Sequence, residues 1–341
     1  MIMKKPYFIA ELAINFYDSA KILGISPLEA AKLYIDAAKG SGADAVKFQA
    51  FKADSSVSKR VPDSSHAFLK EYDSFGSVEH RTLAEYAKSK GIDYMCTAFD
   101  FDSADYLEEL TPIYKVASPD LSYLPLLRHI AAKGKPMIMS VGAAYLSEID
   151  EAVRVVTEAG CPDITLLHCV SVYPCLYEDA NLNVITTLKR VFPNVRIGYS
   201  DHTVPDENMA VLATAYLLGA EVIEKHFTLD KTIPGDLVHY SSGDPGDFAK
   251  AAENFKFIDR ILGSGEITVL DCEMSGRIDG RRSLVLTRDM KAGDIIEKAD
   301  LADKRPATGI PPELSGVVIG RKVCMDLPED TVLTWDMLFN R

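Results

Sequence analysis

The chain lacks the features that mark several large classes of protein. Cysteine is scarce, with six in 341 residues and no CxxC pair, which argues against a disulfide framework and a zinc ribbon. No apolar run approaches the roughly 20 residues of a membrane span. The N-terminal stretch MIMKKPYFIAELAINF reaches an acidic residue, Glu11, too early for a secretory signal.

Basic residues are also fewer than acidic ones. The 37 Lys and Arg residues face 50 Asp and Glu residues, and the formal net charge is -13. Binding to nucleic acid or to an anionic membrane needs clustered cations. We therefore expect no nucleic-acid partner and no membrane partner. The 47% hydrophobic and 26% charged residues are typical of a folded chain, and we expect a cytoplasmic globular protein.

Eight short apolar runs alternate with helical patterns as far as residue 262. The runs span 7–12, 45–49, 93–97, 113–116, 137–140, 164–168, 197–199 and 222–225. They are mostly continuous in hydrophobicity, as parallel strands covered on both faces are. The pattern predicts an α/β fold, a (β/α)8 TIM barrel. The alternative, a doubly wound sheet, would usually carry a Gly-rich turn after its first strand, and residues 11–15 form no such turn.

The helical patterns have clear start and stop signals, and the pattern of the sequence changes from helical to β-like after the last of them. Ser26 and Pro27 are typical of a helix start, and three further helices are expected at 147–159, 208–218 and 247–262. Short β-like runs separated by Gly and Pro begin near residue 281. We therefore expect a barrel domain at 1–265, a linker at 266–280 and a small mainly-β domain at 281–341.

Polar side chains close every predicted strand of the barrel. In chain order they are Glu11, Asn15, Lys47, Gln49, Thr97, Lys115, Ser118, Ser140, His168, Tyr173, Ser200, Asp201, His202, Glu224, Lys225 and His226. The strands of a TIM barrel converge at their C-terminal ends, where the active sites of this fold lie. The pattern therefore predicts a catalytic rim.

Three lysines at this rim, Lys47, Lys115 and Lys225, stand out in an acidic chain. They favour an anionic substrate that carries phosphate, and the neighbouring Thr and Ser hydroxyls suit phosphate oxygens. The alternative is that each lysine pairs with a structural glutamate, such as Glu11 or Glu224.

Two histidines, His202 and His226, follow neighbouring strands. Two imidazoles at adjacent rim positions can hold one divalent metal ion and leave its other positions open for water or substrate. The alternative is that each is a hydrogen-bonded rim residue. His168 lies inside an apolar run, and we expect a core histidine with its hydrogen bonds satisfied. The six cysteines form no cluster, and we expect them to be small buried hydrophobes.

The motifs at these strand ends resemble those of the sialic acid synthase family. These nonulosonate synthases condense phosphoenolpyruvate with an N-acylated hexosamine. The matching stretches are FIAELAIN (8–15), GADAVKFQAFKA (42–53), KVAS (115–118), LLHC and SVYP (166–174), IGYSDHT (197–203) and VIEKHFTLDKTIPG (222–235). RRSLV (281–285), KRPATGI (304–310) and the closing IGRK and DTVLTW match the family's antifreeze-like (SAF) domain. The resemblance covers nearly the whole chain in the right order.

The resemblance implies a role for each matching residue. His202 and His226 correspond to the metal ligands, for manganese or else magnesium or cobalt. The residues that correspond to substrate contacts are Lys47, Gln49, Thr97, Lys115, Ser118, Ser171, Tyr173 and Ser200. Glu11 matches a substrate-facing position, and Asp120 occupies the site of a glutamate that acts on water. Arg305 matches an arginine that the small domain delivers to the partner subunit's sugar, which implies a domain-swapped homodimer.

The chain departs from the family pattern at the sugar end. The usual NHxG motif reads NFYD at 15–18, so its histidine is missing, and Ser171 stands where many members have Asn. The usual PGPDH motif reads PGDLVH at 234–239, which leaves Asp236 as the candidate replacement for a sugar-binding aspartate. The amino sugar is therefore open among N-acetylmannosamine, a diacetamido-trideoxyhexose and a phosphorylated form.

The charges suggest how such a condensation would proceed. The metal ion polarises the aldehyde of the open-chain sugar, and the enol carbon of phosphoenolpyruvate attacks it. Water then adds with Asp120 or Glu11 as base, and phosphate leaves while the lysines, Lys115 among them, hold its charge. Two alternatives remain: a metal-independent aldolase with a Schiff base on Lys115 or Lys225, and a barrel that binds an acidic sugar without turnover.

Overall fold

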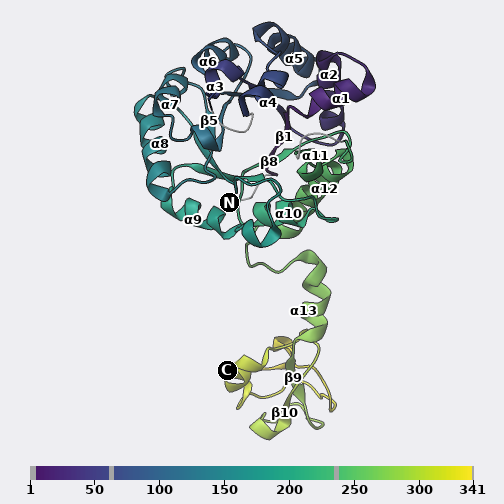
Figure 1. Ribbon diagram of the computed structural model, residues 1–341. Helices are drawn as coiled ribbons and strands as arrows, with labels where there is room; N and C mark the ends of the chain where they lie inside the picture. Colours follow the sequence, from purple (N-terminus) through teal and green to yellow (C-terminus); the bar gives the residue numbers. More distant parts are fainter. Residues whose placement is uncertain (1–4, 61–64, 234–237, 340–341) are drawn as a thin grey trace. The chain divides into compact units, whose positions relative to one another are not determined.

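Eight parallel strands close into a barrel in the first part of the chain, and a ring of helices surrounds them (Figure 1). The computed structural model describes residues 5–60, 65–233 and 238–339. The strands are β1 (Tyr7–Ala13), β2 (Ala45–Ala50), β3 (Asp93–Ala98), β4 (Tyr114–Val116), β5 (Met137–Ser140), β6 (Ile164–His168), β7 (Arg196–Asp201) and β8 (Val222–His226). Each strand pairs with the next, and β8 pairs with β1. The predicted TIM barrel is confirmed.

Helices follow the strands in the order that this fold requires. They are α1 (Asn15–Leu23), α2 (Pro27–Gly40), α3 (Ala53–Ser56), α4 (Ser65–Tyr72), α5 (Ser77–Lys90), α6 (Phe101–Leu107), α7 (Leu124–Ala131), α8 (Leu146–Glu158), α9 (Asn183–Val191), α10 (Ala210–Leu217), α11 (Val238–Ser241) and α12 (Pro245–Leu262). Ser26 caps α2 in a capping box with Glu29, as its sequence predicts. Among the described residues, no helix is both long and apolar enough to cross a membrane.

The interior of the barrel is apolar near its N-terminal end. Six residues fill this layer: Ile9, Ala45, Met95, Ile138, Leu167 and Val222. Gly198 also faces this interior, because a Cβ atom there would lie 2.5 Å from the Leu167 side chain and 2.3 Å from the Val222 carbonyl oxygen. The strands therefore enclose a packed core, and any cavity must lie above this layer.

The chain divides into two compact units between Ser264 and Gly265. In the second unit, β9 (Ser283–Leu286) and β10 (Leu301–Lys304) pair in antiparallel fashion, and a separate apolar core includes Leu286, Ile310 and Leu333. This is the small mainly-β domain that the sequence predicts. The segment expected to be a linker is partly helical, since it contains α13 (Met274–Gly280). A short helix, α14 (Ser315–Val318), completes the unit.

Candidate active site

A cavity of about 250 Å³ lies at the C-terminal mouth of the barrel. Its walls come from the ends of all eight strands or the residues just after them. The lining residues are Glu11, Lys47, Gln49, Thr97, Lys115, Ala117, Ser118, Pro119, Ser140, Cys169, Ser171, Tyr173, Ser200, His202, Glu224 and His226. Most of the residues predicted for the catalytic rim are therefore brought together.

The two-residue period of the strands explains this lining. Side chains two apart on a strand share a face, so each apolar residue of the inner layer is followed by a polar residue nearer the mouth. Ile9 is followed by Glu11, Met95 by Thr97, and Val222 by Glu224 and then His226. The strand register places Lys47 beside Glu11, and Thr97 beside Lys115.

Two lysines and two glutamates form a buried charged cluster in the cavity. The Lys47 ammonium is paired with Glu11 and lies 3.7 Å from Glu224, and the Lys115 ammonium lies 3.6 Å from the other oxygen of Glu224. The pairing with glutamates, weighed as the alternative, is observed, and both lysines also line the cavity, where binding of an anionic substrate stays a prediction. Burial opposes the charge of Lys47, but the two carboxylates outweigh it and raise its pKa.

The pKa values of the other members of the cluster are shifted in directions that suit proton transfer. Burial raises the pKa of Glu11, with repulsion from Glu224 adding to the shift. Burial also disfavours the Glu224 carboxylate, but Lys115 and Lys47 hold its pKa at about 2. Burial lowers the pKa of Lys115, whose ammonium donates to the hydroxyl of Ser140 at 2.8 Å. A single cavity thus contains a stable carboxylate and a carboxyl group that protonates more easily.

Small polar groups form a cradle on one side of the cavity. The backbone N–H of Gly142 donates to Ser118 Oγ at 3.0 Å, and Cys169 Sγ lies 3.1 Å from the same oxygen. A Cβ atom on Gly142 would lie 2.3 Å from Ser171 Oγ. Ser118 and Ser171 also line an adjoining cavity of about 310 Å³. The Gly142 N–H thus holds the Ser118 oxygen, and the two hydroxyls, Ser118 and Ser171, with Lys115 suit the oxygens of a phosphate or a carboxylate.

His202 and His226 are neighbours at the mouth, with ring centroids 5.8 Å apart. His202 Nδ1 lies 2.6 Å from the carbonyl oxygen of Val170, which only accepts, so Nδ1 carries the proton and Nε2 carries the lone pair. Nδ1 of His226 is buried and has no hydrogen-bond partner among the described residues. Burial lowers the pKa of both imidazoles, and the proximity of His202 lowers that of His226 further.

These properties fit a divalent metal ion. Neutral imidazoles that offer a lone pair are the form that binds metals, and a carbonyl on the far nitrogen is the usual way to orient one. The lone pair of His202 Nε2 accepts from the Tyr173 hydroxyl at 3.0 Å, a bond that a metal ion would have to displace. The described residues contain no cluster of three or more His, Cys, Asp or Glu placed as a metal site. An ion on His202 and His226 would therefore take its remaining ligands from water or substrate.

Three predicted site residues are not among the described lining residues of this cavity. Asp120 lies in the short turn after β4 and follows the lining residues Ser118 and Pro119. One of its carboxylate oxygens is buried and has no hydrogen-bond partner among the described residues. Burial raises the pKa of Asp120 to about 6. Asp236 lies outside the described residues. Arg305 belongs to the second unit.

The segment that carries Arg305 is held on both sides. The Ser283 hydroxyl donates to the Pro306 carbonyl at 2.7 Å and accepts from the Gly309 N–H at 2.9 Å. The Ala307 N–H donates to the Ile278 carbonyl at 2.7 Å. A Cβ atom on Gly309 would lie 2.3 Å from a backbone oxygen, so only glycine fits there. Arg305 itself is exposed at the tip of this fixed turn.

One expected rim lysine does not reach the cavity. Lys225 is fully buried and its ammonium pairs with Asp201 at 2.5 Å on the helix-facing side of the barrel. Its position between Glu224 and His226 explains this, because neighbouring side chains of a strand point to opposite faces. Its inclusion among the substrate cations was wrong.

Three of the lining residues, Glu224, Ser140 and Cys169, were given no catalytic or substrate role from the sequence. Strand position had placed Ser140 and Glu224 on the rim, and Glu224 was also named as a partner for a lysine, as the structure shows. His168 is buried and bonded to the Ala180 carbonyl, as expected of a core histidine. The cysteines are less uniform than expected, since Cys272 is exposed.

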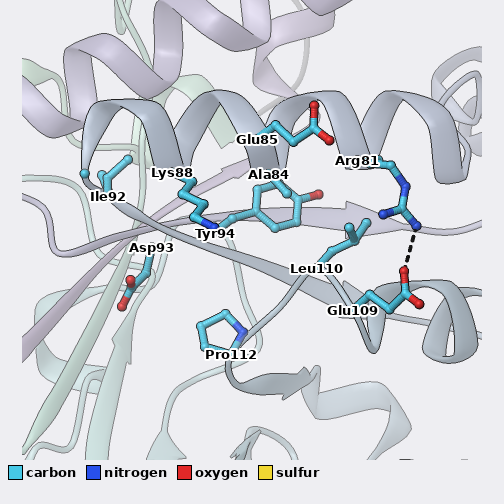
Figure 2. Close-up of a pocket in the computed structure, with 11 residues that line it drawn as sticks. Arg81, Ala84, Glu85, Lys88, Ile92, Asp93, Tyr94, Glu109, Leu110 and Pro112 are labelled. Atoms are coloured by element: carbon cyan, nitrogen blue, oxygen red, sulfur yellow. Dashed lines mark hydrogen bonds and ion pairs between the residues drawn. The ribbon is translucent and has the colours of Figure 1, made fainter.

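A larger cavity lies at the opposite end of the barrel. It measures about 530 Å³ and is bounded by α5, the start of β3 and the segment before β4 (Figure 2). Its charged residues are spread along an open groove, where Arg81 pairs with Glu109 at 3.0 Å. None of the predicted site residues lines it. Volume therefore does not mark the active site in this molecule.

Comparison with known proteins adds independent information. The model of the NeuB family matches residues 34–267, and that of the SAF domain matches residues 281–338. The N,N'-diacetyllegionaminic acid synthase of Legionella pneumophila is 38% identical over 347 residues, which cover 97% of this chain and 94% of that protein. Human N-acetylneuraminate-9-phosphate synthase is 33% identical, with 92% of this chain and 89% of that protein covered.

A solved structure is similar as well. It is the N-acetylneuraminic acid (sialic acid) synthetase of Leptospira borgpetersenii in complex with citrate. That protein is 34% identical to this chain and superposes with a TM-score of 0.70, covering 80% of this chain and 90% of that one.

Proposed function

Because the chain belongs to the NeuB family, we propose that it condenses phosphoenolpyruvate with an N-acylated amino sugar of the mannosamine type. The products are a nonulosonic acid and phosphate. The observation that carries this proposal is the buried cluster of Lys47 and Lys115 with Glu11 and Glu224, next to a cradle of hydroxyls and an unpaired imidazole nitrogen. Cations, proton-transfer groups and metal-binding nitrogens are the three kinds of group that the reaction needs.

The polar cradle would hold phosphoenolpyruvate. Lys115, Ser118 and Ser171 would surround one anionic end, with the Gly142 N–H holding the Ser118 oxygen, and Lys47 with Thr97, 3.1 Å apart, would contact the other. Both lysines are buried, so their attraction for an anion is only weakly screened. The same contacts stabilise the phosphate as it leaves with its developing charge.

The other substrate would lie on the side of the two histidines. A divalent cation held by His202 and His226 would polarise the aldehyde oxygen of the open-chain sugar. Tyr173 and Gln49 would orient this sugar, and Gln49 already donates to Glu11 at 2.9 Å. The enol carbon then forms a bond to the aldehyde carbon, which leaves positive character at the phosphate-bearing carbon. The former aldehyde oxygen takes a proton, for which a protonated Glu11 is the candidate donor, and becomes a hydroxyl.

A base is needed when water adds to the phosphate-bearing carbon. Glu11 lies in the cavity and Asp120 lies beside it, and each has a raised pKa. Either carboxylate can take the proton from water while the oxygen attacks. The bond between this carbon and the phosphate oxygen then breaks, which releases phosphate.

The direct test is release of phosphate from phosphoenolpyruvate with Mn²⁺ and a panel of amino sugars. The panel contains N-acetylmannosamine, its 6-phosphate, and a diacetamido-trideoxyhexose, since relatives named for different products are similarly close. We expect one sugar to support turnover at least tenfold above the others. Phosphate release with no sugar, or with none of the three, would contradict the proposal.

The lowered pKa of Lys115 is also what a Schiff-base aldolase would need. Borohydride treatment in the presence of each substrate distinguishes the two reactions. The proposed synthase gives no trapped adduct and loses activity with a chelator. A covalent adduct on Lys115, or activity that a chelator leaves unchanged, would favour the aldolase.

A further inference from the structure

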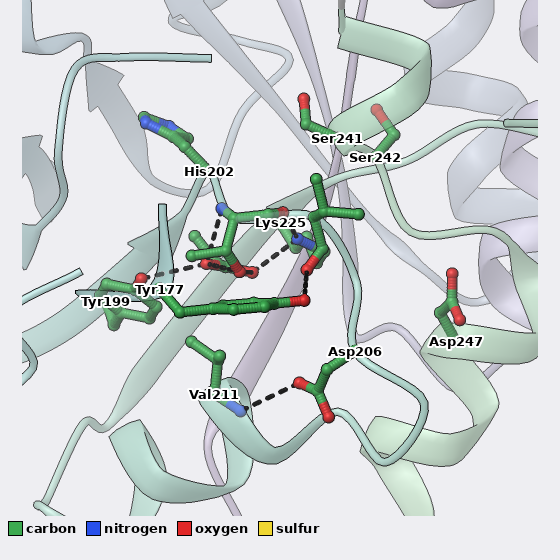
Figure 3. Close-up of polar contacts among 12 residues, drawn as sticks. Tyr177, Tyr199, His202, Asp206, Val211, Lys225, Ser241, Ser242 and Asp247 are labelled. Carbon is green, nitrogen blue, oxygen red and sulfur yellow. Dashed lines mark hydrogen bonds and ion pairs between the residues drawn. The ribbon is translucent and has the colours of Figure 1, made fainter. Parts of the chain in front are cut away.

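A buried ion pair joins the ends of β7 and β8 on the side away from the cavity. Asp201 and Lys225 face each other in the strand register, and their charged atoms lie 2.5 Å apart. Asp201 is 2% exposed and Lys225 is 0% exposed. Figure 3 shows Lys225 within a network of polar contacts that includes Tyr199, with the His202 ring pointing away from it.

The polar contacts of this pair are with other groups of the barrel itself. Asp201 accepts hydrogen bonds from the Tyr199 hydroxyl at 3.0 Å and from the N–H and hydroxyl of Thr203 at 3.0 and 2.9 Å. Lys225 also donates to the Thr203 carbonyl at 3.0 Å. Neither residue belongs to the cavity lining. The pair therefore has no contact through which it could bind substrate.

Stability alone is a weak reason for such a pair. Burying two charges costs desolvation energy, and well-packed apolar residues often replace a buried ion pair without loss of stability. The position of the pair offers another reason. Asp201 directly precedes His202, and Lys225 directly precedes His226. Because adjacent residues of a strand point to opposite faces, a bond on the outer face fixes the spacing of the next side chains on the inner face.

The segment after β7 is also held from its other side. The loop after β6 contacts it three times: Val170 O accepts from His202 Nδ1 at 2.6 Å, Cys175 N donates to His202 O at 2.9 Å, and the Tyr177 hydroxyl donates to Val204 O at 3.0 Å. The bonds from Lys225 to Asp201 and Thr203 are the matching contacts from β8. His202 is thus fixed between two neighbouring strands.

We propose that the Asp201–Lys225 ion pair is a positioning clamp that sets the spacing of the His202 and His226 imidazoles, and so the affinity for a divalent metal ion. This inference rests on the proposed function only in taking these two histidines as the metal-binding pair. The groups that orient metal ligands typically contribute 10- to 100-fold to metal affinity. We expect a change of that size when the clamp is removed.

The test is calorimetric titration of the metal-free, full-length protein with Mn²⁺. The Asp201→Asn/Lys225→Met double variant removes both charges and keeps most of the volume, so no lone charge stays buried. We expect its Mn²⁺ affinity to fall at least tenfold, with an unchanged far-ultraviolet circular dichroism spectrum. The matched control is Ile223→Val, a buried change on the same face of β8, which should stay within twofold of wild type.

The other possible results of this titration would refute either the clamp alone or the clamp together with the metal site. If the folded double variant binds Mn²⁺ within twofold of wild type while His202→Ala does not bind, the clamp is refuted and the metal site stands. If the wild-type protein itself does not bind Mn²⁺, the metal site and the clamp both fail. Should the double variant not fold, Lys225→Arg keeps the charge but changes the reach of the donor. It must then bind Mn²⁺ at least threefold more weakly, or the proposal is wrong.

Discussion

The hydroxyl of Tyr173 lies 3.0 Å from Nε2 of His202, with the two rings 4.1 Å apart between centroids. Since Nδ1 of His202 is engaged by the Val170 carbonyl, the Tyr173 hydroxyl donates to the one nitrogen that could bind a metal ion. In the metal-free protein the phenol therefore competes with the metal for this lone pair. The relationship links substrate contact and metal binding through a single side chain.

Replacing Tyr173 with Phe should therefore strengthen metal binding. Removing a competing hydrogen bond worth about 0.5–1.5 kcal/mol corresponds to a gain of roughly 2- to 12-fold in Mn²⁺ affinity. Turnover should fall in the same variant, because the sugar loses a contact. Calorimetry measures the affinity and phosphate release measures the turnover. Weaker Mn²⁺ binding would mean that the phenol oxygen supports the metal and does not compete with it.

The raised pKa of Asp120 predicts how kcat falls at acidic pH. Burial raises its pKa to about 6, and a base must be ionised to accept a proton. If Asp120 is the base, kcat should fall about tenfold per pH unit below pH 6. Asp120→Asn should lower kcat strongly and remove this limb. An Asn variant with the same acidic limb would assign the base to another group, with Glu11 as the next candidate.

Stability provides a separate check on Asp120. Its carboxyl has a higher pKa in the folded state than the usual 3.8, so the folded state holds the proton more tightly. This contribution to stability is present below pH 3.8 and is lost as the pH rises through about 6. Asp120→Asn should consequently raise the melting temperature relative to wild type more at pH 8 than at pH 4. An equal effect at both pH values would contradict the raised pKa.

Gly142 should be intolerant of even one added carbon. A Cβ atom there would lie 2.3 Å from Ser171 Oγ, 2.8 Å from Cys169 Sγ and 3.0 Å from Ser118 Oγ. These are the ends of side chains, so the fold can accommodate alanine by moving them, but the cradle for phosphoenolpyruvate is then filled. We expect Gly142→Ala to raise KM for phosphoenolpyruvate at least tenfold with a melting temperature near that of wild type. Gly134→Ala, at a position with no heavy atom near the added carbon, controls for loss of a glycine, although its φ of +70° makes it the more strained change.

The barrel could be predicted from the sequence because its strands are short, apolar and regularly spaced. Helix α1 was missed for a physical reason. Its polar residues are buried: Asn15 donates to the Phe227 carbonyl and Ser19 bonds to Tyr34, while the apolar Ile22 and Leu23 are exposed, so burial here does not follow polarity. These partners lie up to 212 residues away in the sequence. Contacts of that kind come only from the folded chain.

The site was predictable to the extent that strand ends converge. Residue type and strand position were enough to place His202 and Lys47 in the cavity lining, but they placed Lys225 wrongly. A lysine next to His226 looked like a substrate group until the alternation of the strand placed it on the outer face. The cradle at Gly142 could not be found either, since a glycine shows its importance only through the side chains around it.

The last prediction concerns Arg305 and the second unit. Arg305 lies in the second unit, exposed on a turn that Ser283 holds through Pro306 and Gly309. The resemblance described above implies that the small domain delivers this arginine to a partner subunit. We propose that Arg305 of one chain closes the sugar site of a second chain in a domain-swapped homodimer.

Complementation between two inactive variants tests this proposal. One variant carries Arg305→Ala and the other His202→Ala, and subunit exchange forms heterodimers. If the arginine acts on the partner's barrel, each heterodimer has one site with both lesions and one site with neither, so activity should recover to about half of normal. Mixing His202→Ala with His226→Ala is the control, because both lesions lie in the barrel and no exchange can restore the metal-binding pair. Absence of recovery, with heterodimers verified by native mass spectrometry, would mean that Arg305 acts within its own chain or has no role in the site.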